Sequence, residues 1–429
     1  RARGRLPTTR DDRAPVDPNL DARISTFYRR WHLLEQSKGK AGGLVLDFDM
    51  VRPQDVPAYG DRLAALAELD QLRSAVAATS GLPNPAYLAQ KLAGSAAYLR
   101  ALLGERRPFS AYLSATMGIE PQRISDSVLQ ARAAELAKDF ADRGVVWGPA
   151  GREAYGHTFG RPTMDGFNDE LRSTAVLLIQ QLQGIHAGIP DPSYRIEVVQ
   201  ADAYWSNWID GSLADGVTLK VNTHPRIEYR TTSALSLAAH EIAGHAVHVG
   251  CLHQSAAPEV GRVSPCALNL TVHACDAFQM EGLAQTMLHH LDCENALPDG
   301  NLSDDHRLME RYREHSGDCM GNAQLLMEDG ASIDEVWALA RRWLPLNAEM
   351  SLSSGLRDRS RDPLLRSYIH VYAPSRRLFM QAIALPAPER RSFFELALRE
   401  LWTPAQLQAL VQGRPADEVR GLSAGPPTV

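Results

Sequence analysis

Hydrophobic positions in the first half of the chain recur with the spacing of amphipathic helices. The region from residue 21 to about 103 is rich in Ala and Leu, as in DRLAALAELDQLRSAVAA at 61–78, and is broken by the turn-forming GLPNP segment. Residues 119–144 and 166–188 show the same periodicity on either side of a Gly-rich connection. The pattern therefore predicts that this half of the chain is helical.

The pattern changes near the middle of the chain. YRIEVV at 194–199 and GVTLKVN at 216–222 are short, rich in β-branched side chains and bounded by turn residues, which is typical of strands. A helix is predicted over 233–250, and helices resume from about 272 to 291 and continue to near residue 412. The predicted fold is mainly α, with a small antiparallel β-sheet beside the helix at 233–250.

Both ends of the chain are predicted to be tails. Residues 1–20 hold five arginines and three prolines with little apolar content, so they cannot bury enough surface to become ordered. Residues 416–429 are the second predicted tail. Between them we expect a helical region at 21–190 and a catalytic region at 191–415. No internal repeat or linker divides these two regions, so they are predicted to form one continuous unit.

Composition and charge narrow the class of protein. The net charge of −6 and the pI near 6.2 give no basic field for nucleic acid or anionic lipid, so we expect neither nucleic acid nor a membrane as a partner. No apolar stretch has the length of a membrane-spanning helix, and the N-terminus shows no apolar core of the kind found in signal peptides. An odd number of cysteines without close pairing predicts a reducing, cytoplasmic compartment and buried thiols. These cysteines are Cys251, Cys266, Cys275, Cys293 and Cys319. The sequence leaves the oligomeric state open.

Ten of the fourteen histidines fall between His224 and His315. Among them, HEIAGH at 240–245 has the two histidines and the glutamate of a zinc-hydrolase helix, but with one extra residue between Glu241 and His245. On a regular helix, residues five apart point about 140° apart, so His240 and His245 would not meet at one metal ion. A one-residue π-type widening, which Gly244 would ease, restores convergence. The alternative is a regular helix with His245 buried and His240 in solvent.

A second signal comes from the helix predicted over 276–291. Glu281 lies within a stripe of apolar residues at helical spacing, namely Ala277, Ala284, Leu288 and Leu291. A buried carboxylate needs a cation nearby. Two histidines and a glutamate form a three-ligand zinc set that leaves a position for water, which predicts one Zn²⁺ held by His240, His245 and Glu281. The alternative is an ion pair from Glu281 to Arg230 or Arg262.

Given the metal, the catalytic roles follow from charge. Zinc lowers the pKa of a bound water toward about 7, and Glu241 is placed to take its proton and pass it to a leaving group. A second group must stabilise the oxyanion, and Tyr372 is our first candidate and His370 our second. The strand at 216–222 could pair with an extended substrate. As substrate-binding cations we expect Arg226, Arg230 and Arg376.

These motifs resemble the HExxxH zinc metallopeptidases, and in particular the tyrosine carboxypeptidase-like family, which is marked by an HExxxH helix and a later Gln-Glu-Gly-Leu-Ala motif. The counterparts here are HEIAGH and Met280-Glu281-Gly282-Leu283-Ala284, with Met280 in place of the glutamine. Ala243-Gly244 brings the first motif nearer to the HExxGH of dipeptidyl peptidase III. The resemblance implies a gluzincin-like architecture, the zinc ligands His240, His245 and Glu281, and Glu241 as the base.

The function expected from the sequence is hydrolysis of peptide or amide bonds, in the manner of a carboxypeptidase or a dipeptidase. Its substrate would be a peptide or a small amide. Two alternatives stay open. One is a small-molecule metalloenzyme of a biosynthetic pathway, including one that uses non-haem iron, because two histidines and one carboxylate also suit that metal. The other is a binding protein without catalytic activity.

Overall fold

Helices build most of the fold, as the sequence predicts. The structure is a computed structural model that describes residues 19–52, 55–161, 163–203, 205–298, 300–347 and 349–422, so the predicted tail at 1–20 lies almost wholly outside the described residues. The helices are α1 (Leu20–Ser37), α2 (Arg62–Ala78), α3 (Pro85–Leu102), α4 (Phe109–Met117), α5 (Asp126–Ala141), α6 (Arg152–Phe159), α7 (Phe167–Ile185), α8 (Ser233–Leu237), α9 (Val247–Ser255), α10 (Asp276–Cys293), α11 (Asp304–Glu328), α12 (Ile333–Trp343), α13 (Glu349–Arg361), α14 (Pro363–Ile383), α15 (Ala387–Arg399), α16 (Pro404–Val411) and α17 (Ala416–Arg420).

A small sheet accompanies the helices. Its strands are β1 (Phe48–Asp49), β2 (Tyr194–Val199), β3 (Asn207–Ser212), β4 (Gly216–Asn222) and β5 (Asn269–Leu270), in the spatial order β2-β4-β3-β1-β5. The sheet is mixed, which corrects the expectation of a purely antiparallel one. β3 and β4 form an antiparallel hairpin, but β2 pairs with β4 and β1 with β3 in parallel. The parallel pairs arise because β2 lies beside β4 and not beside its neighbour in sequence, β3.

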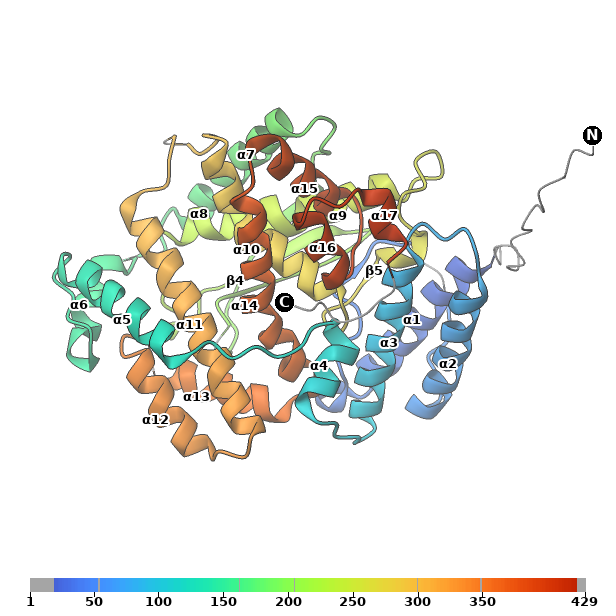
Figure 1. Ribbon diagram of the computed structural model, residues 1–429, viewed down its shortest axis with the longest axis horizontal. Helices are drawn as coiled ribbons and strands as arrows, with labels where there is room; N and C mark the ends of the chain where they lie inside the picture. The colour runs from blue at the N-terminus through green and yellow to red at the C-terminus, as the bar shows by residue number, and fades with distance from the viewer. Residues whose placement is uncertain are drawn as a thin grey trace, which may run out of the picture.

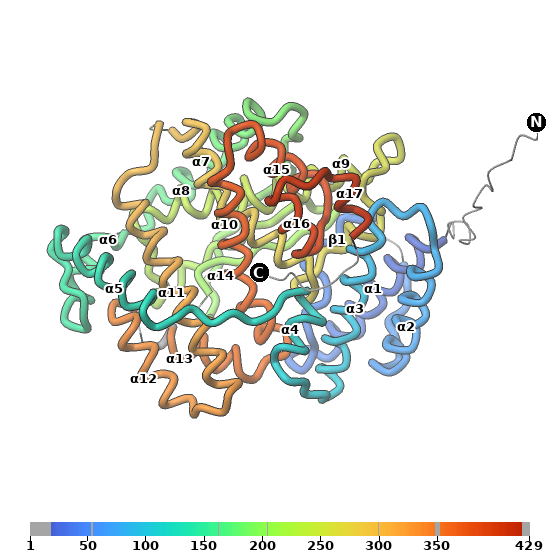
Figure 2. Tube along the Cα trace, viewed as in Figure 1, coloured from blue at the N-terminus to red at the C-terminus, as the bar shows by residue number. Residues whose placement is uncertain are grey.

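The central helices of the molecule are α10 and α14, which pack against each other (Figure 1). In this view α1–α4 lie on one side of them and α5, α6 and α11–α13 on the other, and the trace in Figure 2 shows the same division. The π-helical segment η3 (Ala238–Ala246) packs against α10, α7 and β4. The sheet therefore lies next to the segment that carries the HEIAGH motif, as predicted.

The apolar residues form two cores. The larger one includes the aromatic side chains of α1, the centres of α3, α7, α10 and α14, and the inner face of the sheet. The smaller one is centred on Phe140 and Tyr312 and draws on α5, α6, α11, α12 and α13. Residues from both predicted regions, 21–190 and 191–415, contribute to each core. Each core therefore draws on both regions.

Two details of the chain differ from expectation. Residues 416–420 form α17, whose Val419 is buried and whose Arg420 pairs with Glu400, so the predicted C-terminal tail begins with an ordered helix. Cys293 is exposed, whereas the other four cysteines are buried; all five have free thiols. Within the described residues, no helix combines the length and apolar character needed to cross a membrane.

Candidate metal centre

The HEIAGH motif lies in a π-helical segment. η3 continues α8 and leads directly into α9, and at its end the N–H of Val247 donates to the carbonyl of Ile242, five residues earlier. This wider turn is the distortion predicted from the five-residue spacing of the two histidines. With it, the imidazole rings of His240 and His245 come together, and their centroids are 4.9 Å apart. The regular helix with His240 turned away is therefore wrong.

Two glycines set the distance between the motif and the helices behind it. A Cβ on Gly244 would lie 2.7 Å from Cα of Ala284, so only glycine lets η3 approach α10 this closely. A Cβ on Gly282 would lie 2.3 Å from the ring of Phe379, which sets the approach of α10 to α14 in the same way. Real Cβ atoms essentially never show contacts shorter than 3.0 Å. Both glycines therefore have a role in bringing the site together.

His240, His245 and Glu281 each offer one ligand atom, and these three atoms all lie within 4.8 Å of one another. Nε2 of His240 is 3.5 Å from Oε2 of Glu281, and Nε2 of His245 is 3.9 Å from Oε1. In a tetrahedral site with zinc bonds of about 2.0 to 2.1 Å, two ligand atoms lie about 3.4 Å apart. The distances between the three ligand atoms thus need to shorten by amounts from a few tenths of an ångström to a little over one ångström for the atoms to fit one ion.

The protonation states of the three groups suit a cation. Burial lowers the pKa of His245 to about 4 and lowers that of His240 well below its usual value, so both rings are neutral ligands at pH 7. Oε2 of Glu281 is buried without a hydrogen-bond partner. Burial raises the pKa of Glu281 to about 7, against the lowering effect of hydrogen bonds from Tyr368 and Tyr372. A divalent ion would supply the missing partner for this carboxylate.

Glu241 lies beside this group and has a partner of its own. Oε1 of Glu241 accepts a hydrogen bond of 2.5 Å from the amide of Asn207 on β3, and it lies 3.9 Å from Nε2 of His240. The amide of Asn207 is oriented in turn by Ser206, whose hydroxyl donates to Oδ1 at 2.7 Å. Burial and the neighbouring carboxyl of Glu281 raise the pKa of Glu241 to about 8. A carboxyl with such a pKa can both accept and release a proton near neutral pH.

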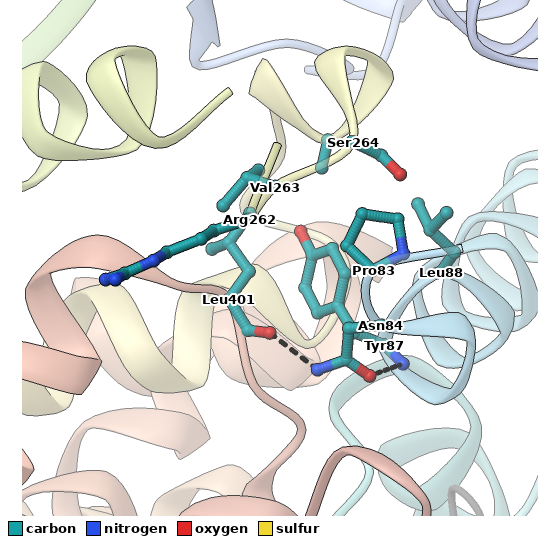
Figure 3. Close-up of a pocket in the computed structure, with 9 residues that line it drawn as sticks. Pro83, Asn84, Tyr87, Leu88, Arg262, Val263, Ser264 and Leu401 are labelled. Atoms are coloured by element: carbon teal, nitrogen blue, oxygen red, sulfur yellow. Dashed lines mark hydrogen bonds between the residues drawn. The ribbon is translucent and has the colours of Figure 1, made fainter. Parts of the chain in front are cut away.

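A cavity of about 1530 Å³ opens in front of these residues. His240, Glu241, His245 and Glu281 line it, together with residues of α1, β3, α13 and α14. It is larger than the roughly 300 to 1,000 Å³ of common small-molecule pockets, so a peptide would fit. A second hollow beside α3, shown in Figure 3 around Asn84 and Leu401, has a volume of only about 10 Å³ and has room for no more than a water molecule.

Strand β3, and not the predicted β4, presents an edge to the cavity. β4 pairs with β2 on one side and β3 on the other, so its main chain has no free edge, and the expectation that 216–222 binds substrate is wrong. β1 covers β3 only at Gly211 and Ser212. The strand was not predicted, because NWIDGS has no alternation and all six of its residues are half-buried.

Of the two residues predicted to stabilise the oxyanion, one lines the cavity and the other does not. Tyr372 lines the cavity, and its hydroxyl is 2.6 Å from that of Tyr368. His370 does not line it; this ring is buried on another face of α14, beside Phe109, with Nδ1 3.2 Å from the side-chain oxygen of Gln324. His370 is therefore removed as an oxyanion group, because residues two apart on a helix point about 160° apart.

The three predicted substrate-binding arginines are also outside the cavity lining. Arg226 pairs with Asp202, and Arg230 pairs with Glu228 at 3.1 Å while stacking over the ring of Tyr155. Arg376 is buried against acidic side chains of α11, donating to Glu314 at 2.8 Å. Each has a carboxylate partner in the fold, which is the physical reason that none of them is presented to a substrate.

Three further residues belong to the site: Asn207 and Asp47, which the sequence did not indicate, and Tyr368, which lies in the same stretch as the preferred candidates Tyr372 and His370. Asn207 holds Glu241, as described above, and the hydroxyl of Tyr368 donates to Oε1 of Glu281 at 2.7 Å. Asp47, just before β1, lines the cavity, and burial together with Glu281 and Asp210 raises its pKa well above the usual value. Only Tyr368 carried a signal, since it is one helical turn before Tyr372 and must share its face.

Comparisons with known proteins leave the family open. No protein-family model matches the chain, and no curated protein sequence matches it. Among solved structures, a protein of Colwellia psychrerythraea named as a candidate lipoprotein is 12% identical, with 94% of this chain and 77% of that one covered and a TM-score of 0.47. Metallocarboxypeptidase 1 of Trypanosoma cruzi is 10% identical, with 94% and 96% covered and a TM-score of 0.41. A distant structural neighbour is thus a metallocarboxypeptidase, and the site itself must carry the functional argument.

Proposed function

We propose that this protein is a zinc-dependent hydrolase of peptide or amide bonds. One observation carries the proposal: the π-helical turn brings His240 and His245 to Glu281 while Glu241 stays beside them at the wall of a large cavity. Two neutral histidines and one carboxylate are the ligands of catalytic zinc sites that keep a position open. The donor set and its spacing fit one ion.

Zinc bound there would polarise the scissile carbonyl and make an attacking water more acidic. Glu241 takes the proton from that water and delivers it to the departing amine, so one carboxyl serves as base and then as acid. Asn207 holds Oε1 of Glu241 by its amide and so fixes the orientation of this carboxyl group beside His240. Fixing the base in this way lowers the entropy that must be lost when the reaction begins.

Tyr372 is our proposed donor to the oxyanion. It lines the cavity, and burial near Glu281 raises its pKa well above the usual value, so its hydroxyl keeps its proton at every physiological pH. Tyr368 donates to Glu281 and lies within hydrogen-bond distance of Tyr372, so it can hold the ligand and the donor in one arrangement. Preorganised donors of this kind typically contribute about 10²- to 10³-fold to turnover.

The test begins with metal analysis of protein purified without added metal, followed by turnover of a mixed peptide library. We expect one zinc per chain, loss of cleavage with a chelator and recovery on adding zinc. Glu241→Gln should keep the metal and lose activity by at least about 10²-fold. Glu259→Gln, which changes an exposed glutamate on the loop after α9, is the matched control and should behave as the unmodified protein. Stoichiometric iron with oxygen consumption would contradict the hydrolase and favour an oxygen-using enzyme instead.

A further inference from the structure

The cavity contains a short free strand edge that begins at Glu241. The N–H of Gly211 donates to the carbonyl of Asp47, and the N–H of Leu213 donates to that of Asp49, so these two residues of the β3 segment face β1. Because main-chain groups alternate sides along a strand, Asn207 and Ile209 face the same way. Among the described residues nothing is hydrogen-bonded to their main chain on that side, and both line the cavity.

Asp47 closes this edge at its far end. Its neighbours in the cavity wall have their charges satisfied: Asp49 accepts from Arg29 at 2.8 and 3.0 Å, and Asp210 accepts from Lys220 at 2.5 Å. The carboxyl of Asp47 has no hydrogen-bond or ion-pair partner among the described residues, although it is partly buried. A carboxylate in this situation is a binding site for a cationic group that is brought by a ligand.

We propose that Asp47 binds the free amino terminus of a peptide substrate, so that the enzyme is an exopeptidase acting from that end. The inference rests on the hydrolase function proposed above and deepens it. Asp47 would be a specificity-determining residue, and its partner is the α-ammonium group. Because β1 covers the edge of β3 from Gly211 onward, a longer peptide cannot continue its main-chain pairing beyond Asp47.

The direction of the substrate follows from charge. A peptide that pairs with Asn207 and Ile209 continues the line of β1, and one of its ends must then meet Asp47. An ammonium group there stabilises the charged form of Asp47 and forms an ion pair with it, whereas a carboxylate would raise the pKa of Asp47 further and gain no such attraction. The substrate therefore runs antiparallel to β3, from Asp47 towards Glu241, which is the direction that also permits the more stable ladder.

The length of the edge sets where the cut falls. In the register of β1 with β3, Phe48 lies opposite Gly211, so Asp47 lies opposite Asp210, three residues from the Asn207 that holds Glu241. At about 3.4 Å per residue the edge spans roughly 10 Å, and this accommodates about two or three substrate residues between the ammonium group and the scissile bond. The expected products are therefore short amino-terminal fragments, such as dipeptides or tripeptides.

The experiment uses the full chain loaded with zinc and one eight-residue peptide in four forms, with the amino terminus free or acetylated and the carboxyl terminus free or amidated. Acetylation should lower kcat/KM by about 10- to 100-fold, since it removes one charged hydrogen bond, whereas amidation should have little effect. Asp47→Asn should remove this discrimination. Asp215→Asn is the matched control, because Asp215 also lines the cavity but is exposed and bonded to Ser212. Mass spectrometry should find the short amino-terminal fragment.

Equal cleavage of the free and acetylated peptides would refute the role of Asp47 while leaving the hydrolase function intact. A second result would refute it as well: amidation of the carboxyl terminus abolishes cleavage, and Arg361→Gln causes a similar loss. Arg361 is an exposed cation of the same cavity, and it would then hold the carboxylate of a carboxypeptidase substrate. If none of the four peptides is cleaved by the zinc-loaded chain, the proposed function fails and this inference fails with it.

Discussion

Replacing Gly244 by alanine tests how closely the π-helical segment η3 must approach α10. The new Cβ would lie 2.7 Å from Cα and 2.9 Å from Cβ of Ala284, and neither atom belongs to a flexible side chain. Carbon atoms pack at about 3.5 to 4.0 Å, so η3 and α10 must separate by about 1 Å. Such overpacking costs about 1 to 3 kcal/mol of unfolding free energy. It would also widen the gap of 3.5 Å between His240 and Glu281.

The assay for this variant combines urea unfolding of the metal-free protein with a competitive zinc titration. We expect the loss of stability given above and a fall in zinc affinity of about 10- to 100-fold, as for other changes that misplace metal ligands. Gly184→Ala is the matched control, because Gly184 is helical, lies in α7 and has nothing within 4 Å of an added Cβ. That change should stabilise the protein slightly. Unchanged stability and zinc affinity in Gly244→Ala would refute the reasoning.

Three further predictions follow from single contacts. Asn207→Ala should lower kcat about 10- to 100-fold with zinc stoichiometry unchanged, since it frees Glu241 without touching a ligand, and an unchanged kcat would remove Asn207 from the account. Tyr372→Phe should lower kcat by about 10²-fold and change KM much less, and an effect on KM alone would exclude an oxyanion role. The free energy of unfolding should fall as the pH drops below about 6.5, because burial lowers the pKa of His273 and His370 to about 3 in the folded protein. Each of these rings then gains a proton only on unfolding, which lowers the free energy of unfolding by up to about 1.4 kcal/mol per pH unit. Urea midpoints measured between pH 7.5 and 5.5 would detect this loss.

The candidate metal centre was predictable because its signals are local. The spacing of His240 and His245, together with Glu281 in an apolar stripe, required a bulged helix, and the structure has a π-helical segment there. The strands 194–199 and 216–222 were also predicted with the bounds that β2 and β4 have in the structure. In each case a short-range periodicity decides the outcome.

What the sequence did not reveal depends on contacts between distant segments. Asn207 reaches Glu241 only because β3 lies beside η3, and Asp47 reaches the cavity only because β1 extends the sheet past Gly211. Nothing in the local pattern of either residue indicates these positions. His370 is a different case, since the phase of α14 separates it from Tyr372, and helical geometry alone would have excluded it.

Zinc binding by His240, His245 and Glu281 can be seen directly in a crystal structure of the protein soaked with zinc, with the ion located from its anomalous signal. We expect one ion within about 2.0 to 2.1 Å of a ring nitrogen of His240 and of His245, and within about 2.0 to 2.2 Å of a carboxylate oxygen of Glu281, with a fourth position open towards the cavity. An ion bound elsewhere, or a regular helix at 240–245 that leaves His240 without contact to the metal, would contradict it.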